Sequence, residues 1–262
     1  MRDRFIPMCT LIIGVDVVAP GTVILAGNRD EDPGRPSRGP DVLSRSPRVV
    51  GGSDAVAGGT WMAVRERRAA VAMLNRWPGD SPAPASGDLR SRGRLTLDLA
   101  GGIGVHANLG EFAAGWGSYL LAEAQYAPLN MVFASPSVTW LWSHRGDEDD
   151  EQRGLQVAQG WHVLTHRELD DPNEPRAAYL KQVLDPWRPG YAQEAREGLM
   201  ELLASHDPPR VCLHRGRMVT VSSFVVWLAR DEARYHHLDG RPCERPLTDW
   251  SHLLDGSFDA GE

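Results

Sequence analysis

The apolar positions in the first third of the chain follow the period of buried strands joined by tight turns. This pattern predicts four strands in two hairpins: Thr10–Val18 with Thr22–Gly27, and Met62–Val64 with Ala69–Leu74. Residues 32–57, which are rich in Pro, Gly, Ser and Arg, are predicted to form one long ordered loop between the hairpins. Both hairpins end in polar residues followed by turn residues, so their ends are candidate positions for functional side chains.

Beyond residue 90 the apolar positions alternate between helical and strand spacing. Helices are predicted at 94–100, 109–125, 171–184 and 192–205, and further strands at 129–134, 138–142, 155–158, 162–165, 210–214, 219–229 and 233–237. Helices on the outer faces of two antiparallel sheets would bury every apolar face, so an α+β fold is expected: a four-layer αββα sandwich. We expect one domain over residues 1–262, with a leading extension or propeptide (1–8), a core (9–245) and a surface tail (246–262).

Composition and charge narrow the class of protein. A length of 262 residues, 42% hydrophobic and 24% charged residues are typical of a soluble globular chain. A net charge of −7 argues against a nucleic-acid partner, which requires clustered positive charge. Apolar runs are too short or interrupted for a signal peptide or stable membrane insertion, so a cytoplasmic location is expected. Three scattered cysteines indicate neither a disulfide framework nor a metal site, and Cys212 is interpreted as a packing residue.

Cys9 is the first candidate for chemistry because it follows a methionine and opens an apolar strand. As the first residue of a mature chain, it would carry a thiol and a free α-amine together. The reference pKa of an α-amine is near 7.7–8.0, so such an amine can accept the proton of the thiol near neutral pH. The alternative interpretation is that Cys9 is a small hydrophobic residue of the core.

A polar cluster, Asn28-Arg29-Asp30-Glu31, follows the second predicted strand and would lie near Cys9 in an antiparallel hairpin. Strand alternation directs Asn28 and Asp30 to one face and Arg29 and Glu31 to the other. The cluster is either a solvated strand end or a functional group of side chains. Asn75 ends the second hairpin, where it either caps a turn or offers its amide to an oxyanion.

Together these residues resemble the NRDE family, also called the transport and Golgi organisation 2 family. The resemblance is ordered over residues 8–95 and is carried by Met8-Cys9-Thr10, Ala26 to Glu31, Arg35-Pro36, Gly58-Gly59-Thr60-Trp61, Leu74-Asn75 and Ser91-Arg92-Gly93. That family in turn is similar to N-terminal-nucleophile hydrolases of the bile-salt hydrolase and penicillin V acylase group. The chain departs from those hydrolases at His166, where they carry asparagine, and at Thr220-Val221-Ser222, where they use an arginine.

The resemblance implies roles for the candidate residues. Cys9 would be the nucleophile, its α-amine the base and Asn75 an oxyanion donor. Arg29, with Asp30 or Glu31, would position the cysteine, and Asn28 belongs to the same cluster. We further predict substrate contacts from four residues: Trp61, Trp77, Arg92 and His166.

Two functions are therefore expected from the sequence. The first is hydrolysis of a small linear, non-peptide amide with an apolar acyl group, which requires that Cys9 be freed by a translation start at Met8 or by propeptide cleavage. The second is non-catalytic binding and trafficking of a small amphipathic molecule, either haem or an acyl-lipid. No metal and no cofactor are predicted, and haem is considered only as a ligand.

Overall fold

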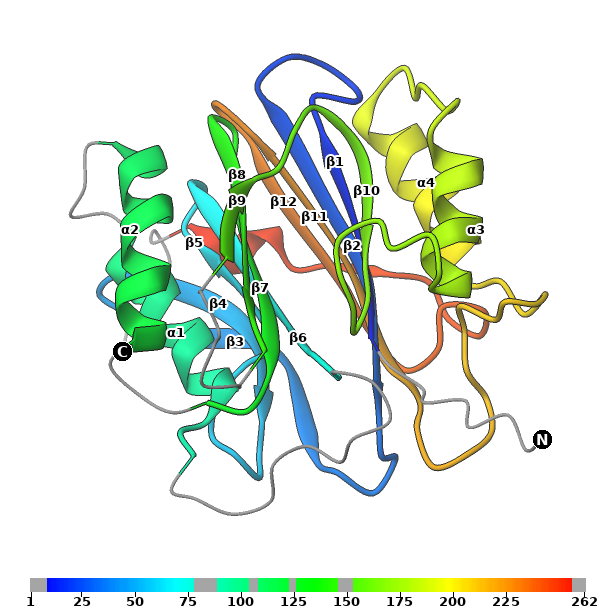
Figure 1. Cartoon of the computed structure of the whole chain (residues 1–262), viewed down its shortest axis with the longest axis horizontal. Helices are drawn as coiled ribbons and strands as arrows, with labels where there is room; N and C mark the ends of the chain where they lie inside the picture. Colours follow the sequence, from blue (N-terminus) through cyan, green and yellow to red (C-terminus); the bar gives the residue numbers. More distant parts are fainter. Residues whose placement is uncertain (1–8, 78–88, 104–107, 123–125, 146–152, 256–262) are drawn as a thin grey trace.

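Two antiparallel sheets face each other, and each carries two helices on its outer face (Figure 1). This structure, a computed structural model, describes residues 9–77, 89–103, 108–122, 126–145 and 153–255. The α+β class and the four-layer αββα sandwich predicted from the sequence are confirmed.

The first sheet has the strand order β10-β1-β2-β11-β12-β13. Its strands are β1 (Thr10–Val15), β2 (Thr22–Glu31), β10 (Gly160–Leu164), β11 (Val219–Ala229), β12 (Ala233–Asp239) and β13 (Thr248–Asp249). β2 is longer than predicted, because it continues through the whole polar cluster to Glu31 while pairing with β11. The cluster is therefore held in regular strand geometry instead of a solvated strand end.

The second sheet has the order β3-β4-β5-β6-β7-β8-β9. Its strands are β3 (Ser37–Arg45), β4 (Arg48–Asp54), β5 (Met62–Arg65), β6 (Ala69–Asn75), β7 (Leu129–Ser135), β8 (Val138–His144) and β9 (Arg153–Gln156). Every neighbouring pair in it is antiparallel. The order follows the chain, so each strand reaches its partner through a short connection or through the helices between β6 and β7.

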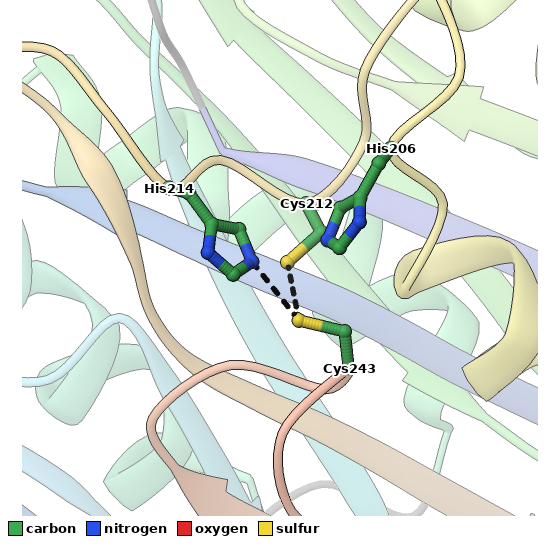
Figure 2. A group of neighbouring side chains, drawn as sticks. All are labelled: His206, Cys212, His214 and Cys243. Atoms are coloured by element: carbon green, nitrogen blue, oxygen red, sulfur yellow. Dashed lines mark hydrogen bonds between the residues drawn. The ribbon is translucent and has the colours of Figure 1, made fainter.

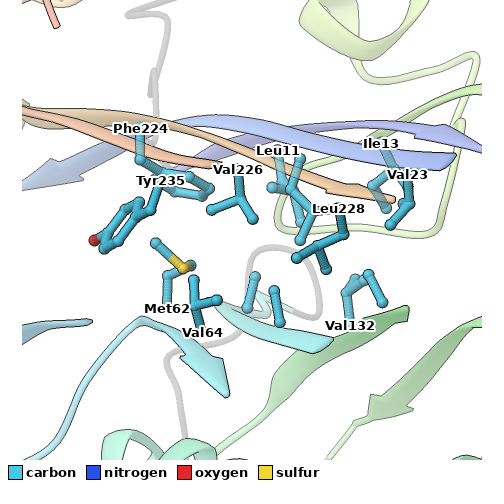
Figure 3. Close-up of a cluster of buried hydrophobic side chains, with 14 of the residues drawn as sticks. Leu11, Ile13, Val23, Met62, Val64, Val132, Phe224, Val226, Leu228 and Tyr235 are labelled. Atoms are coloured by element: carbon cyan, nitrogen blue, oxygen red, sulfur yellow. The ribbon is translucent and has the colours of Figure 1, made fainter. Parts of the chain in front are cut away.

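The helices cover the outer faces of the two sheets (Figure 1). They are α1 (Arg92–Gly102) and α2 (Leu109–Ala122) over the second sheet, and α3 (Pro175–Leu184) and α4 (Ala192–Leu203) over the first. The described residues form three apolar cores, and the central one between the sheets includes Leu11, Val226 and Phe224 (Figure 3). In the described part of the chain, no helix is long and apolar enough to cross a membrane.

The prediction of one long loop over residues 32–57 is wrong, because most of these residues form β3 and β4. Two glycines in β4 are needed because neighbouring groups pack too closely for a side chain. A Cβ on Gly51 would lie 2.4 Å from the carbonyl oxygen of Met62, and one on Gly52 would lie 2.6 Å from the Trp61 ring. β3 is an edge strand with few buried positions, so it lacks the alternating pattern of a half-buried strand.

Two predictions near the C-terminal end also need correction. The strand expected at 210–214 is absent, because Val211 and Cys212 both donate their backbone N–H to the Ser205 carbonyl instead of to a neighbouring strand. The expected surface tail contributes β13 and a 3-10 turn (Ser251–Leu254), and Leu254 is buried in the central core. Residues 256–262 lie outside the described part of the chain.

The two glycine-containing segments of the family resemblance pack on each other. A Cβ on Gly59 would lie 2.3 Å from the backbone carbon of Gly93, and the Thr60 N–H donates to the Gly93 carbonyl at 3.1 Å. Backbones can approach this closely only where neither residue has a side chain. The contact fixes the neighbouring residues Trp61 and Arg92 relative to each other.

Candidate functional site

Cys9 lies between β2 and the end of β10, at one edge of the central core. The β1–β2 register pairs Thr10 with Asn28, so the same register places Arg29 opposite Cys9. On the other side, β1 pairs Leu11 with Leu164, and continuing that register places His166 opposite Cys9. The Cys9 thiol donates a long hydrogen bond to the Asp30 carbonyl, with Sγ and O 3.7 Å apart. The hairpin thus brings the cluster to the thiol, as predicted.

A cavity opens beside Cys9 between the two sheets. Its lining is mainly apolar: Cys9, Thr10, Leu11, Asn28, Arg29, Trp61, Ala72, Met73, Leu74 and Phe224. This lining favours an apolar group beside the thiol.

Arg29 and Glu31 point toward the interior between the sheets. The Arg29 guanidinium carbon lies 4.4 Å from the centre of the Trp61 ring, a cation–π contact. Arg29 also donates to Ser37 Oγ at 3.3 Å and pairs with Glu31 at 3.4 Å. The structure therefore brings together Cys9, Arg29 and Trp61, three of the predicted site residues.

Asn28 points the opposite way, toward α4. Its side-chain amide donates to the carbonyls of Leu203 (2.9 Å) and Val211 (3.0 Å), and its Oδ1 accepts from Ser223 Oγ at 2.7 Å. These side-chain hydrogen bonds all go to buried partners on the α3/α4 side of the sheet. Asn28 thus ties the end of α4 and the segment after it to the sheet that carries Cys9.

Asp30 also points to the α3/α4 side, where its carboxylate meets Arg176 on α3 at 3.2 Å. It also accepts from Thr220 Oγ1 at 2.7 Å, and Arg176 donates to Thr10 Oγ1 at 3.1 Å. Burial raises the pKa of Asp30 to about 6, against the opposing effect of Arg176. The alternation predicted for the cluster is confirmed: the side chains of Asn28 and Asp30 bond to partners on the α3/α4 side, whereas Arg29 and Glu31 pair with each other on the opposite face.

The environment of Cys9 disfavours a thiolate. Burial raises the pKa of its thiol to about 11, the Asp30 carboxylate adds to the rise, and Arg29 opposes it. While residue 8 is attached, the nitrogen of Cys9 is an amide and cannot act as a base. A free α-amine on Cys9 would place a base beside this thiol.

The remaining predicted residues lie around this edge of the sheets. Asn75 is the last residue of β6 and its side chain is exposed, outside the described cavity lining. The Trp77 N–H donates to the His166 carbonyl at 3.1 Å, which joins the two sheets next to Cys9. Arg92 is half-buried and donates to the Pro128 carbonyl at 2.9 Å. Burial lowers the pKa of Arg92, and a charge on Cys9 would raise it, so the two groups are electrostatically coupled.

Arg176 was not anticipated from the sequence. It is buried on the inner face of α3 with Ala177, Leu180 and Leu184. An arginine at helical spacing with apolar residues is the signal that would have identified it, because a buried cation requires a buried anion. Its partner, Asp30, belongs to the predicted cluster.

His166 is predicted to make stability depend on pH. Burial lowers its pKa from 6.5 to about 4, assisted by Arg167 and Arg176. The folded protein then binds fewer protons than the unfolded chain, so this contribution is present above pH 6.5 and is lost as the pH falls toward 4. We expect His166→Gln to reduce the loss of stability between pH 7 and pH 5 by about 1–2 kcal/mol, measured by urea unfolding.

Comparing wild type with His166→Gln also separates the effect of His166 on stability from that of Asp30, which changes with pH in the opposite direction. The folded pKa of Asp30 is raised, so its contribution is present below pH 3.8 and is lost as the pH rises through about 6. Asp30 is present in both wild type and His166→Gln, so its contribution to the pH dependence of stability is the same in the two proteins. Identical pH dependence in the two proteins would show that His166 does not titrate abnormally.

Comparisons with known proteins agree with this architecture. The structure is similar to a Caenorhabditis elegans N-acylethanolamine-hydrolyzing acid amidase (NAAA) ortholog, with a TM-score of 0.57, 16% identity, and coverage of 83% of this chain and 92% of that chain. Two variants of conjugated bile acid hydrolase from Clostridium perfringens each match with a TM-score of 0.47 and 10% identity, covering 93% and 92% of this chain and 96% of theirs. The comparison with curated protein sequences gives no match.

The first likeness extends over most of both chains and shows a shared fold. A family model, Transport and Golgi organisation 2, matches residues 8–228. That range contains Cys9, the Asn28–Glu31 cluster, Arg176 and the other residues of the site described above. The chain therefore belongs to the Transport and Golgi organisation 2 family.

Proposed function

We propose that the protein is an N-terminal-cysteine hydrolase of small linear amides with an apolar acyl group. The observation that carries this proposal is the position of the Cys9 thiol, which lines an apolar cavity between the sheets directly beside Arg29. A nucleophile at the wall of an apolar cavity can meet the carbonyl of a bound acyl chain. The shared sandwich fold supports the same reaction class.

The base in this proposal is the α-amine of Cys9. A start at Met8, followed by removal of that methionine, would leave Cys9 as the first residue. The family match begins at Met8, which supports this order of events. The amine would lie on the same residue as the thiol, so proton transfer would need no other side chain.

The reaction then proceeds in two balanced halves. The α-amine takes the thiol proton, the sulfur attacks the amide carbonyl carbon, and a C–S bond forms. The tetrahedral intermediate collapses with cleavage of the C–N bond, and the leaving amine takes the proton from the α-ammonium group. Water, deprotonated by the α-amine, then attacks the thioester, and the C–S bond breaks to give a carboxylic acid and the free thiol.

The cavity indicates the class of substrate. The apolar walls suit an acyl chain, and Arg29 and Arg92 supply positive charge near the thiol. The C. elegans ortholog is described as hydrolysing N-acylethanolamines. An N-acyl amide with a small polar amine is therefore the first substrate to test.

Substitution of Cys9 and Asn75 tests the proposal. In a chain that begins at residue 9, Cys9→Ala is expected to abolish release of the amine and the acyl-enzyme detected by intact mass. We expect Asn75→Ala to lower kcat by about 10²–10³-fold, because it removes a proposed hydrogen-bond donor to the oxyanion. Asn173→Ala is the matched control, since Asn173 is also exposed and lies just before α3. Full turnover by Cys9→Ala would exclude the proposed nucleophile.

A second function is favoured by the raised pKa of the Cys9 thiol, which stays protonated while residue 8 is attached. In that form the cavity would bind an amphipathic acyl-lipid or haem without turnover. His166, which the β1–β10 register places opposite Cys9, is the imidazole that could ligate a haem iron. A saturable Soret shift on titration with haem, lost in His166→Ala, would support this function. A spectrum equal to that of free haem would exclude haem binding.

A further inference from the structure

Four potential metal ligands meet close to the segment that Asn28 holds on the α4 side of the first sheet. Figure 2 shows their side chains pointing toward one another. His206, Cys212 and His214 lie on the connection between α4 and β11, and Cys243 lies on the connection between β12 and β13. Their ligand atoms all lie within 4.8 Å of one another. The sequence suggested no metal site because Cys243 is far along the chain from the other three.

The spacing of these atoms is that of a tetrahedral metal site. Cys212 Sγ and Cys243 Sγ are 3.5 Å apart, and His214 Nε2 is 3.0 Å from Cys243 Sγ. The His206 and His214 rings are 4.6 Å apart between centres. A zinc ion with Zn–S bonds of about 2.3 Å would hold two thiolate sulfurs about 3.8 Å apart. The four groups therefore need only small shifts to surround one ion.

We propose that His206, Cys212, His214 and Cys243 bind one zinc ion. Two thiolates and two imidazoles form a closed tetrahedral set, which is typical of structural zinc. A carboxylate supports the orientation of one ligand, since Glu244 Oε1 lies 3.8 Å from Nδ1 of His214 while Nε2 faces the cluster. Histidine ligands of metals usually contact such a group through the second ring nitrogen.

The proposed site is joined to the residues that hold Cys9 in place. Asn28 donates to the carbonyl of Val211, next to Cys212. Leu213 donates its N–H to Thr220 Oγ1, which in turn donates to Asp30. The ion would therefore stabilise the connection between α4 and β11, which contains no strand or helix, in its position against β2, the strand with Asn28 and Asp30.

Metal analysis of the untagged full chain, purified without chelator, tests the proposal directly. We expect about one zinc per chain in wild type after equilibration with zinc and removal of the excess. Cys243→Ser and His214→Ala, both at exposed positions, are expected to weaken zinc binding by at least about 100-fold. Two controls should keep the zinc: His252→Ala, at another exposed histidine, and Cys9→Ser, in the cavity. Wild type without stoichiometric zinc, or equal binding by all variants, would overturn the proposal.

Cobalt substitution identifies the ligands without relying on variants. Two thiolates in a tetrahedral Co²⁺ site should give sulfur-to-cobalt charge-transfer bands and intense ligand-field bands, displaced by zinc. The alternative, a Cys212–Cys243 disulfide, would lower the intact mass by two hydrogens and prevent this spectrum. Such a disulfide in the native protein would overturn the proposal. None of these measurements depends on amide hydrolysis, so this site and the proposed reaction fail or succeed independently.

Discussion

A chain that begins at Cys9 is expected to hydrolyse its amide substrate about 10³–10⁴-fold faster than a chain that keeps residues 1–8. With a thiol pKa of about 11, only about one Cys9 in ten thousand is ionised at pH 7. A free α-amine removes this barrier, because it accepts the proton during attack. The expected difference is in kcat/KM for an N-acyl amide with a small polar amine.

The measurement compares forms of verified N-terminus. Intact mass establishes that one form begins at Cys9 and that a second carries a single alanine before it. The second form is the matched control, since it differs by one residue and lacks only the free amine on Cys9. We expect it to be as slow as the chain with residues 1–8. Equal kcat/KM in the three forms would contradict the role of the amine as the base.

Arg176→Met is expected to destabilise the protein by about 3–5 kcal/mol at pH 7. Arg176 and Asp30 are 3% and 0% exposed, so the substitution leaves a carboxylate buried without its cation. Removing one partner of a buried ion pair costs far more than removing one partner of a surface pair. Urea unfolding followed by tryptophan fluorescence measures the difference.

The control for this substitution is Arg67→Met. Arg67 pairs with Asp255 at 2.6 Å, but the two side chains are 44% and 37% exposed, so a loss of less than about 1 kcal/mol is expected. The double variant Arg176→Met/Asp30→Asn should recover part of the stability, because it removes the unpaired charge as well. A loss below 1 kcal/mol in Arg176→Met would show that water or another group satisfies Asp30.

Much of the architecture was predictable because it depends on local periodicity. The hairpin from Thr10 to Gly27 and the strand–helix order fixed the layers, since each apolar face must be covered. Alternation alone placed Arg29 and Asp30 on opposite faces. The contacts of Asp30 with α3 were not predictable, because they depend on how a helix more than 140 residues later packs on the sheet.

Two features were not predicted, because they depend on contacts between segments that are distant in the sequence. Gly51 and Gly52 suggested a loop, yet they allow β4 to lie against the Met62 backbone and the Trp61 ring. The apolar run Val211-Cys212-Leu213 suggested a strand, but its backbone bonds to Ser205 and a threonine hydroxyl instead. In both cases the residue types are explained by the groups that pack against the segment in the folded protein, and a single sequence does not reveal those groups.

The division of the Asn28–Glu31 segment between two faces has a consequence for interpreting related sequences. Asn28 and Asp30 satisfy buried partners of the helix layer, so a homologue without any turnover would still need them to reach its native state. Arg29 lines the cavity and also pairs with Glu31 and stacks on Trp61, so its replacement would alter both ligand chemistry and packing. The four-residue signature is thus in large part a mark of shared architecture, and activity within the family must be judged from the cavity lining as a whole.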